Sequence, residues 1–252
     1  MATGLACRLF QANFKHIFMM DIETPVAVRR KVSFCEAIHD GSIIVEGIEA
    51  KKISDVDEIP SVWVGNRIPV LVDPDWTAVK AMHPHVVIDA IIAKKNLGTT
   101  AFDARLVIGL GPGFEAGKDV HMVIETNRGH NLGRIILKGC PEANTGVPGN
   151  IGGYTIERVL RSPCNGVFTS ALTIGTKVKE NDVIGHVDGQ PVTARIDGIL
   201  RGLIRDHTRV TDQLKIGDID PRGNKTYCTT ISEKARAVGG SVLEAILREY
   251  NH

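Results

Sequence analysis

The chain has 252 residues, 43% of them hydrophobic, which excludes a disordered chain. Its 30 Lys and Arg residues nearly balance 29 Asp and Glu residues, so a general nucleic-acid binder with a large basic face is excluded. No apolar run approaches the ~18 residues of a membrane span and no signal peptide is evident, so we expect a cytoplasmic protein. The five Cys residues lack C-x-x-C spacing, which disfavours a disulfide framework or a zinc ribbon.

The first forty residues predict a helix, a strand and a second helix. Apolar residues between 5 and 10 have helical spacing, and 16–20 form a short apolar strand that ends at Asp21. An acidic residue at the end of the second strand is where a Rossmann-type domain holds a ribose. An acidic turn before Pro25 is equally explained by ordinary turn chemistry. The first strand and glycine turn of such a domain are missing.

Strand-length apolar runs separated by turn residues follow. Leu106–Leu110 is the clearest strand, and 86–93 is long enough for a strand or a helix. Together with the helical segments, these runs predict an α/β, Rossmann-like domain over residues 1–160. The other predicted strands cover 43–45, 62–64, 69–72, 120–125 and 133–137.

Residues 166–188 and 198–220 repeat one another at an offset of 32. Each copy contains short alternating strands, and two such units must pack together to bury a face, which predicts a pseudosymmetric β-sandwich. The pattern resembles the barrel-sandwich hybrid of biotinyl and lipoyl carriers, but the joint over 188–197 has no modifiable Lys, so we expect a docking or structural role. We place this β-rich domain at 161–231 and a C-terminal amphipathic helix within 232–252.

A glycine-rich turn follows the strand at 106–110. Gly109, Gly111 and Gly113 would let backbone N–H groups approach an anion. A dinucleotide fingerprint needs G-x-G-x-x-G opening a helix, so G-x-G-x-G with Pro112 inside it is a weak nucleotide motif.

Polar residues gather after the next predicted strand. His121 and Glu125 share a strand face, and Arg128 and His130 follow. This group predicts a metal, phosphate or proton-transfer site, in which Arg128 holds phosphate and His121 and Glu125 handle protons or a metal. The alternative is a set of hydrogen-bonded residues at a strand end.

A second Gly-, Pro- and Asn-rich loop covers 138–153 and is either a binding loop or a linker. Asn144 and Thr145 are its candidate ligand-binding residues. Cys140 is the thiol best placed for reactivity, because Lys138 would favour the thiolate, although an inert thiol explains it as well. A third group, Asp89 and 94–96, is typical of a solvated segment end.

At these residues the chain resembles a bacterial family. The segments MATGLACRLFQANF, VIGLGPGFEAGKDVHMVIETNRGHNLGRII and NTGVPGNIGGYTIERVL are similar to the selenium-dependent molybdenum hydroxylase system proteins, the YqeB-like family. Members of that family usually begin with a strand and an R-G-A-G-D-type turn, and this sequence starts after that turn. Either the start codon was assigned internally or this member has lost the element, so phosphate cradling at that turn stays open.

The resemblance implies an accessory protein that matures selenium-dependent molybdenum hydroxylases, its expected partner. Its ligand would be the molybdenum cofactor, a nucleotide-linked precursor or labile selenium. The resemblance supplies no catalytic residue, so whether the chain is an enzyme stays open. Two other functions also stay open, a nucleotide-dependent oxidoreductase or nucleotidyl transferase and a non-catalytic docking protein for the apo-hydroxylase. Neither nucleic acid nor a membrane is expected as a partner, and homo-oligomerisation is left open.

Overall fold

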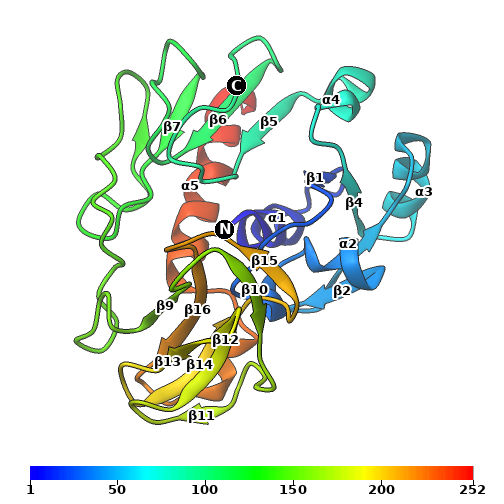
Figure 1. Cartoon of the computed structure of the whole chain (residues 1–252). Coiled ribbons are helices and arrows are strands. Elements are labelled where there is room, and N and C mark those ends of the chain that lie inside the picture. The colour runs from blue at the N-terminus through cyan, green and yellow to red at the C-terminus, as the bar shows by residue number, and fades with distance from the viewer. Residues whose placement is uncertain (252) are drawn as a thin grey trace. The chain divides into compact units, whose positions relative to one another are not determined.

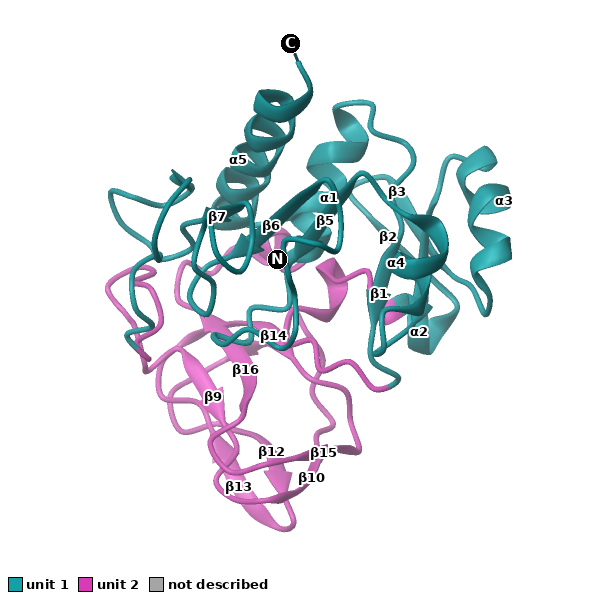
Figure 2. Cartoon of the chain, turned by 90° about the horizontal axis from the view of Figure 1, so that it is seen from above, with its two compact units in different colours: residues 1–23, 37–145, 231–252 teal, residues 24–36, 146–230 magenta. Residues whose placement is uncertain are grey.

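The computed structural model describes residues 1–251 and divides them into two compact units, each built from separate stretches of sequence (Figure 2). The first unit contains residues 1–23, 37–145 and 231–252, and the second contains 24–36 and 146–230.

One sheet of the first unit has the order β1-β4-β3-β2. Its strands are β1 (Met19–Asp21), β2 (Ser42–Val45), β3 (Ile48–Lys52) and β4 (Ile68–Val72). β1 and β3 run parallel to β4, and β2 turns back antiparallel to β3. The short helical elements around these strands are α2 (Glu36–Asp40), η2 (Val56–Glu58), α3 (Ile59–Val64) and α4 (Thr77–Met82).

The strand predicted at 62–64 is wrong, because these residues end helix α3. Asp55 and Glu58 form a capping box that starts the helical segment, and Pro60 lies in the first turn of α3, where its missing N–H costs no hydrogen bond. Ile59 and Val62 then pack with Leu71 of β4. Local capping chemistry therefore outweighs the β propensity of a Val-Trp-Val run.

The other sheet of the first unit has the order β5-β6-β7-β8. β5 (Val86–Asp89), β6 (Leu106–Leu110) and β7 (Met122–Ile124) are parallel, and β8 (Ile135–Ile136) is antiparallel to β7. All five residues of β6 are buried, as expected for a strand covered on both faces. The strand predicted at 106–110 is confirmed.

Helices α1 (Ala2–Gln11) and α5 (Glu233–Tyr250) pack together and share a core with β6 and β7 (Figure 1). Ser232 caps α5 by accepting a hydrogen bond from the Ala235 N–H. The helix predicted near the C-terminus is present, and its apolar face joins the first unit through Val238, Val242 and Ile246.

The second unit contains two antiparallel four-stranded sheets around one hydrophobic core, with orders β13-β12-β10-β15 and β11-β14-β16-β9. The sequence repeat is confirmed by the strands, and the structure adds one more strand to each copy. Copy one supplies β9–β12 and copy two supplies β13–β16. Their bounds are β9 (Val159–Arg161), β10 (Gly166–Thr169), β11 (Lys177–Val178), β12 (Val183–Val187), β13 (Gln190–Thr193), β14 (Gly198–Leu203), β15 (Thr208–Val210) and β16 (Lys215–Asp220). The second unit also contains the short helical turns η1 (Arg30–Val32) and η3 (Lys225–Cys228).

The short third strand of each copy pairs with the other copy. β11 of copy one hydrogen-bonds to β14 of copy two, and β15 of copy two hydrogen-bonds to β10 of copy one. If each strand of copy one is replaced by the corresponding strand of copy two, and the reverse, the order of one sheet becomes the order of the other. The two halves of this unit are therefore interlocked as well as repeated.

The predicted fold class, a Rossmann-like α/β region followed by a biotinyl- or lipoyl-like barrel-sandwich domain and a C-terminal helix, is wrong. The chain is mostly β structure, in four small four-stranded sheets with few helices. The N-terminal strands do not form one doubly wound sheet, because β2 and β8 reverse direction and close two separate mixed sheets. Within residues 1–251, no helix combines the length and the apolar character needed to cross a lipid bilayer.

Candidate functional site

The carboxyl ends of β5, β6 and β7 meet at one edge of their sheet because these three strands are parallel. Asp89 ends β5, the glycine-rich turn follows β6, and Glu125 follows β7. Asp89 is buried and accepts hydrogen bonds from the Ile91 N–H and the Thr99 hydroxyl, at 3.0 and 2.6 Å. Asp89, the glycine-rich turn and Glu125, which the sequence had singled out separately, thus lie at one edge of the sheet.

The glycines of the turn are required by contacts of the chain with itself. Gly113 has φ +112°, and a Cβ built there would lie 2.6 Å from the backbone nitrogen of Lys95. Gly111 has φ +72°, and its Cβ would collide with the Thr126 hydroxyl. These positions therefore let neighbouring loops approach the turn closely.

Glu125 ties two loops together. Its buried carboxylate accepts the Asn127 N–H at 2.6 Å and the Glu142 N–H at 2.7 Å. Glu142 in turn accepts the side-chain amides of Asn131 and Asn127, which hold the pKa of Glu142 below its ordinary value. A depression of about 370 Å³ adjoins these loops. Its lining comprises Glu125, Asn131, Arg134, Ile135, Ile136, Leu137, Lys138, Cys140, Pro141 and Glu142.

Two cationic side chains follow the carboxyl ends of these strands, Lys94 after β5 and Arg128 after β7, and a third, Lys234, interacts with both through its charge. Arg128 pairs with Glu233 at 2.7 Å, and Lys94 donates to the Asn144 side chain at 2.8 Å. Lys234 lies in the first turn of α5. Burial, followed by the charge of Arg128, lowers the pKa of Lys234, and Lys94 acts in the same direction. We call Lys94, Arg128 and Lys234 the cation cluster.

The two predicted histidines do not join this cluster in any hydrogen bond. His121 precedes the three-residue strand β7 and Glu125 follows it, so they lie at opposite ends of the strand. The His121 ring accepts the Val107 N–H at 3.0 Å through Nδ1, and His130 is exposed in a turn. Among residues 1–251 no group of three or more His, Cys, Asp or Glu side chains is arranged to hold a metal ion.

The remaining predicted residues lie in the loop that follows β8. Cys140 is exposed and contributes to the depression. Asn144 contacts Lys94, and Thr145 is the next residue along the chain. Sequence reasoning gave Lys94 no role and overlooked Lys234. A Lys in the first turn of a helix, where acidic residues are favoured, was the signal available for Lys234.

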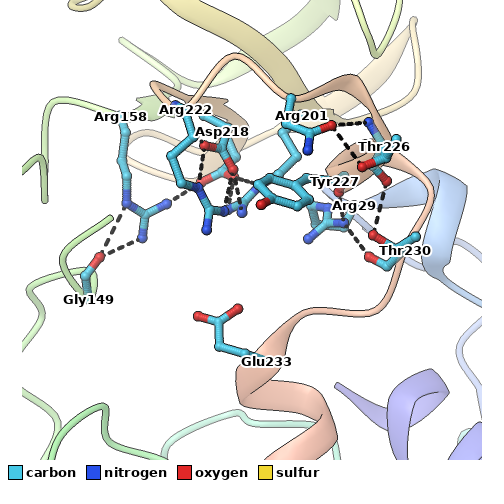
Figure 3. Close-up of polar contacts among 12 residues, drawn as sticks. Arg29, Gly149, Arg158, Arg201, Asp218, Arg222, Thr226, Tyr227, Thr230 and Glu233 are labelled. Atoms are coloured by element: carbon cyan, nitrogen blue, oxygen red, sulfur yellow. Dashed lines mark hydrogen bonds and ion pairs between the residues drawn. The ribbon is translucent and has the colours of Figure 1, made fainter. Parts of the chain in front are cut away.

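A buried ion network in the second unit was also not predicted. Asp218 lies in β16, is 1% exposed, and accepts hydrogen bonds from Arg158 and Arg201 (Figure 3). Arg158 also donates to the Gly149 carbonyl at 2.9 Å. Burial alone would raise the pKa of Asp218, but the charges of Lys215, Arg201 and Arg158 outweigh it and hold the pKa below its ordinary value.

Asp220 extends the same network. It accepts hydrogen bonds from Arg201 at 2.9 Å and from Arg222 at 2.9 and 2.7 Å. The Arg222 guanidinium also lies over the Tyr227 ring, 4.3 Å from its centroid. The network joins β14, β16 and the segment before η3, so its first role is to hold the second unit together.

The structure contains two units built from small sheets, and the first unit carries the cation cluster beside the carboxyl edge of β5–β7. The chain is 47% identical over 246 residues to the uncharacterized protein YqeB of Escherichia coli strain K12. The match covers 98% of this chain and 45% of YqeB, so the chain spans less than half the length of that relative. This similarity supports the YqeB-like resemblance and does not bear on activity.

Comparisons with family models and solved structures do not indicate a function. No protein-family model matches the chain. An aspartoacylase family protein from Mesorhizobium loti is 19% identical, with a TM-score of 0.24 over 25% of this chain and 23% of that one. A succinylglutamate desuccinylase/aspartoacylase from Rhodobacter sphaeroides is 16% identical, with a TM-score of 0.24 over 48% and 46%. Scores this low transfer neither fold nor activity.

Proposed function

We propose that this chain binds a phosphate-bearing small molecule at the carboxyl edge of β5–β7, as a cytoplasmic accessory protein in the maturation of selenium-dependent molybdenum hydroxylases. The place in hydroxylase maturation rests on the family resemblance alone. The ligand class rests on the cation cluster. Of the ligands that the resemblance implies, the molybdenum cofactor and a nucleotide-linked precursor carry phosphate, so this site favours them over labile selenium.

The observation that carries the ligand class is that Lys94 and Arg128 follow the carboxyl ends of β5 and β7, two strands of one parallel set. Arg128 also pairs with Glu233, the neighbour of Lys234 in the chain. Lys234 stands at the amino end of the 18-residue helix α5, where the helix dipole also attracts an anion. A guanidinium binds phosphate oxygens through paired N–H groups, and ammonium groups add point charges. An anion placed here would offset the repulsion that Arg128 and Lys94 exert on Lys234.

A nucleotide-dependent enzyme is the second candidate, favoured by the depression beside Glu125. Its volume of about 370 Å³ falls within the range of small-molecule pockets. Its lining offers the polar groups Asn131 and Glu142 for orienting a ligand. Binding of a nucleoside diphosphate at least tenfold tighter than that of pyrophosphate would favour this candidate.

We expect pyrophosphate to bind the wild-type chain, and the double variant Lys94→Gln/Arg128→Gln to bind it at least about tenfold more weakly, because each substitution removes one charge-assisted contact. Calorimetric titration at constant ionic strength measures this. The control is Lys80→Gln/Arg105→Gln, which removes the same charges from exposed positions of the same unit. Equal affinities in the two double variants would contradict the site.

The proposed role in the maturation of selenium-dependent hydroxylases can be tested in cells. A strain that lacks this protein should contain inactive selenium-dependent hydroxylase, and the wild-type chain should restore its activity. The Lys94→Gln/Arg128→Gln variant should restore little activity, whereas the control double variant should restore it fully. Full hydroxylase activity in the deletion strain would contradict the role in maturation.

A further inference from the structure

The two carboxylates of the ion network in the second unit are saturated with hydrogen bonds. Asp218 accepts four, two of them from Arg201. Asp220 also accepts four, one from Arg201 and three from Arg222. An ionised carboxylate offers about four acceptor sites, so neither carboxylate can accept a hydrogen bond from a further cation.

Arg29 is a further cation beside this network. Its Nη2 donates to the carbonyls of Tyr227 and Thr230, at 2.6 and 3.0 Å, and the Arg222 guanidinium lies over the ring of the same Tyr227 (Figure 3). The Nε of Arg29 is buried and has no hydrogen-bond partner among residues 1–251. Burial, followed by the charge of Arg201, lowers the pKa of Arg29 to about 10, against the attraction of the two carboxylates. The network therefore does not compensate the charge of Arg29.

A guanidinium that is removed from water without an anion is costly, and its planar set of N–H groups suits the oxygens of phosphate. Arg29 is half-buried and Arg222 is exposed, so both can be reached by a small ion. We propose that the second unit binds a phosphate-sized oxyanion at Arg29, with Arg222 as the neighbouring cation that keeps its bonds to Asp220. This site is separate from the cation cluster, because all its residues belong to the second unit.

The test uses inorganic phosphate and the full chain with Lys94→Gln/Arg128→Gln, so that the cation cluster of the first unit does not contribute. Calorimetric titration at constant ionic strength should show phosphate binding to this chain. Adding Arg29→Gln should weaken that binding at least about tenfold, because it removes a charge-assisted contact. The matched control is Arg209→Gln, at an exposed position of β15 in the same unit, which should change the affinity by less than about twofold.

A second measurement needs no substitution and covers the case in which Arg29→Gln disturbs folding. Phenylglyoxal modifies accessible guanidinium groups, and peptide mass spectrometry follows Arg29 and Arg209 in one sample of the wild-type chain. Phosphate at about ten times its Kd should slow the modification of Arg29 at least about fivefold and leave that of Arg209 unchanged. Absence of phosphate binding, equal affinities with and without Arg29→Gln, or unprotected Arg29 would each mean that the network is structural only and would overturn the inference.

Discussion

Asp218→Asn is expected to lower the free energy of unfolding by about 3–5 kcal/mol, the cost typical of breaking a buried ion pair by removing one partner. The substitution leaves Arg158 and Arg201 in the interior without the carboxylate that they share. Urea denaturation of the full chain, followed by circular dichroism, measures the change. Asp212→Asn, at an exposed position of the same unit, is the matched control and should change stability by less than about 0.5 kcal/mol.

The same network gives a pH dependence with a definite sign. The pKa of Asp218 is lowered in the folded protein by Lys215, Arg201 and Arg158, and that of Asp220 by Arg222 and Arg201, in both cases against the effect of burial. Their stabilisation is therefore complete above the unfolded-state pKa of about 4 and is lost as pH falls through the lower folded-state values. The Asp218→Asn variant should lose less stability than the wild type over this acidic range. Parallel pH profiles of the two proteins would contradict this role of Asp218.

Gly113→Ala is expected to lower the free energy of unfolding by about 3 kcal/mol, since the change combines an unfavourable φ with a steric collision. At φ +112°, the new methyl group would lie 2.6–2.8 Å from backbone atoms of Lys95, which cannot rotate away. Displacement of this segment should also move Lys94 and weaken pyrophosphate binding. Thermal unfolding and the calorimetric titration measure the two effects.

Gly98→Ala separates the cost of the unfavourable φ from the cost of the steric collision. Gly98 has φ +128°, but nothing lies within 4 Å of a Cβ built there. This variant should lose only about 1 kcal/mol, the cost of the backbone conformation alone. Equal losses in the two variants would show that the contact between Gly113 and Lys95 contributes nothing to stability.

The sequence predicts individual elements better than their assembly. The apolar run at 106–110 was sufficient to predict strand β6, and the repeat at an offset of 32 was sufficient to predict two matching sets of strands. Each is a local pattern with one structural solution. The pairing of strands was not predictable in this way, because β2 and β8 reverse direction through turns that leave the apolar pattern unchanged. The strand predicted for Val62–Val64 was wrong for a different reason. Capping residues before this run determined that it is helical.

The candidate site was predictable only in part. The sequence singled out Arg128, which belongs to the cation cluster, and Asn144, which accepts a hydrogen bond from Lys94 of that cluster. The buried Glu125 was also singled out, but its carboxylate is used to fasten loops. The cluster itself needs Lys94 and Lys234, which are 140 positions apart in the sequence. Their charges interact in a fold in which α5 packs on β6 and β7. No local pattern contains that information.

The exchange of β11 and β15 between the two copies in the second unit constrains how this unit arose. A chain with one copy would leave its third strand unpaired and could complete the two sheets only with a second identical chain. The two-copy chain is therefore equivalent to a symmetrical dimer fused into one polypeptide. Fusion frees the halves from having to be identical. At an offset of 32, Arg201 and Asp218 of the ion network occupy the positions of Thr169 and His186 in the other half, so the two halves have diverged where the network was built.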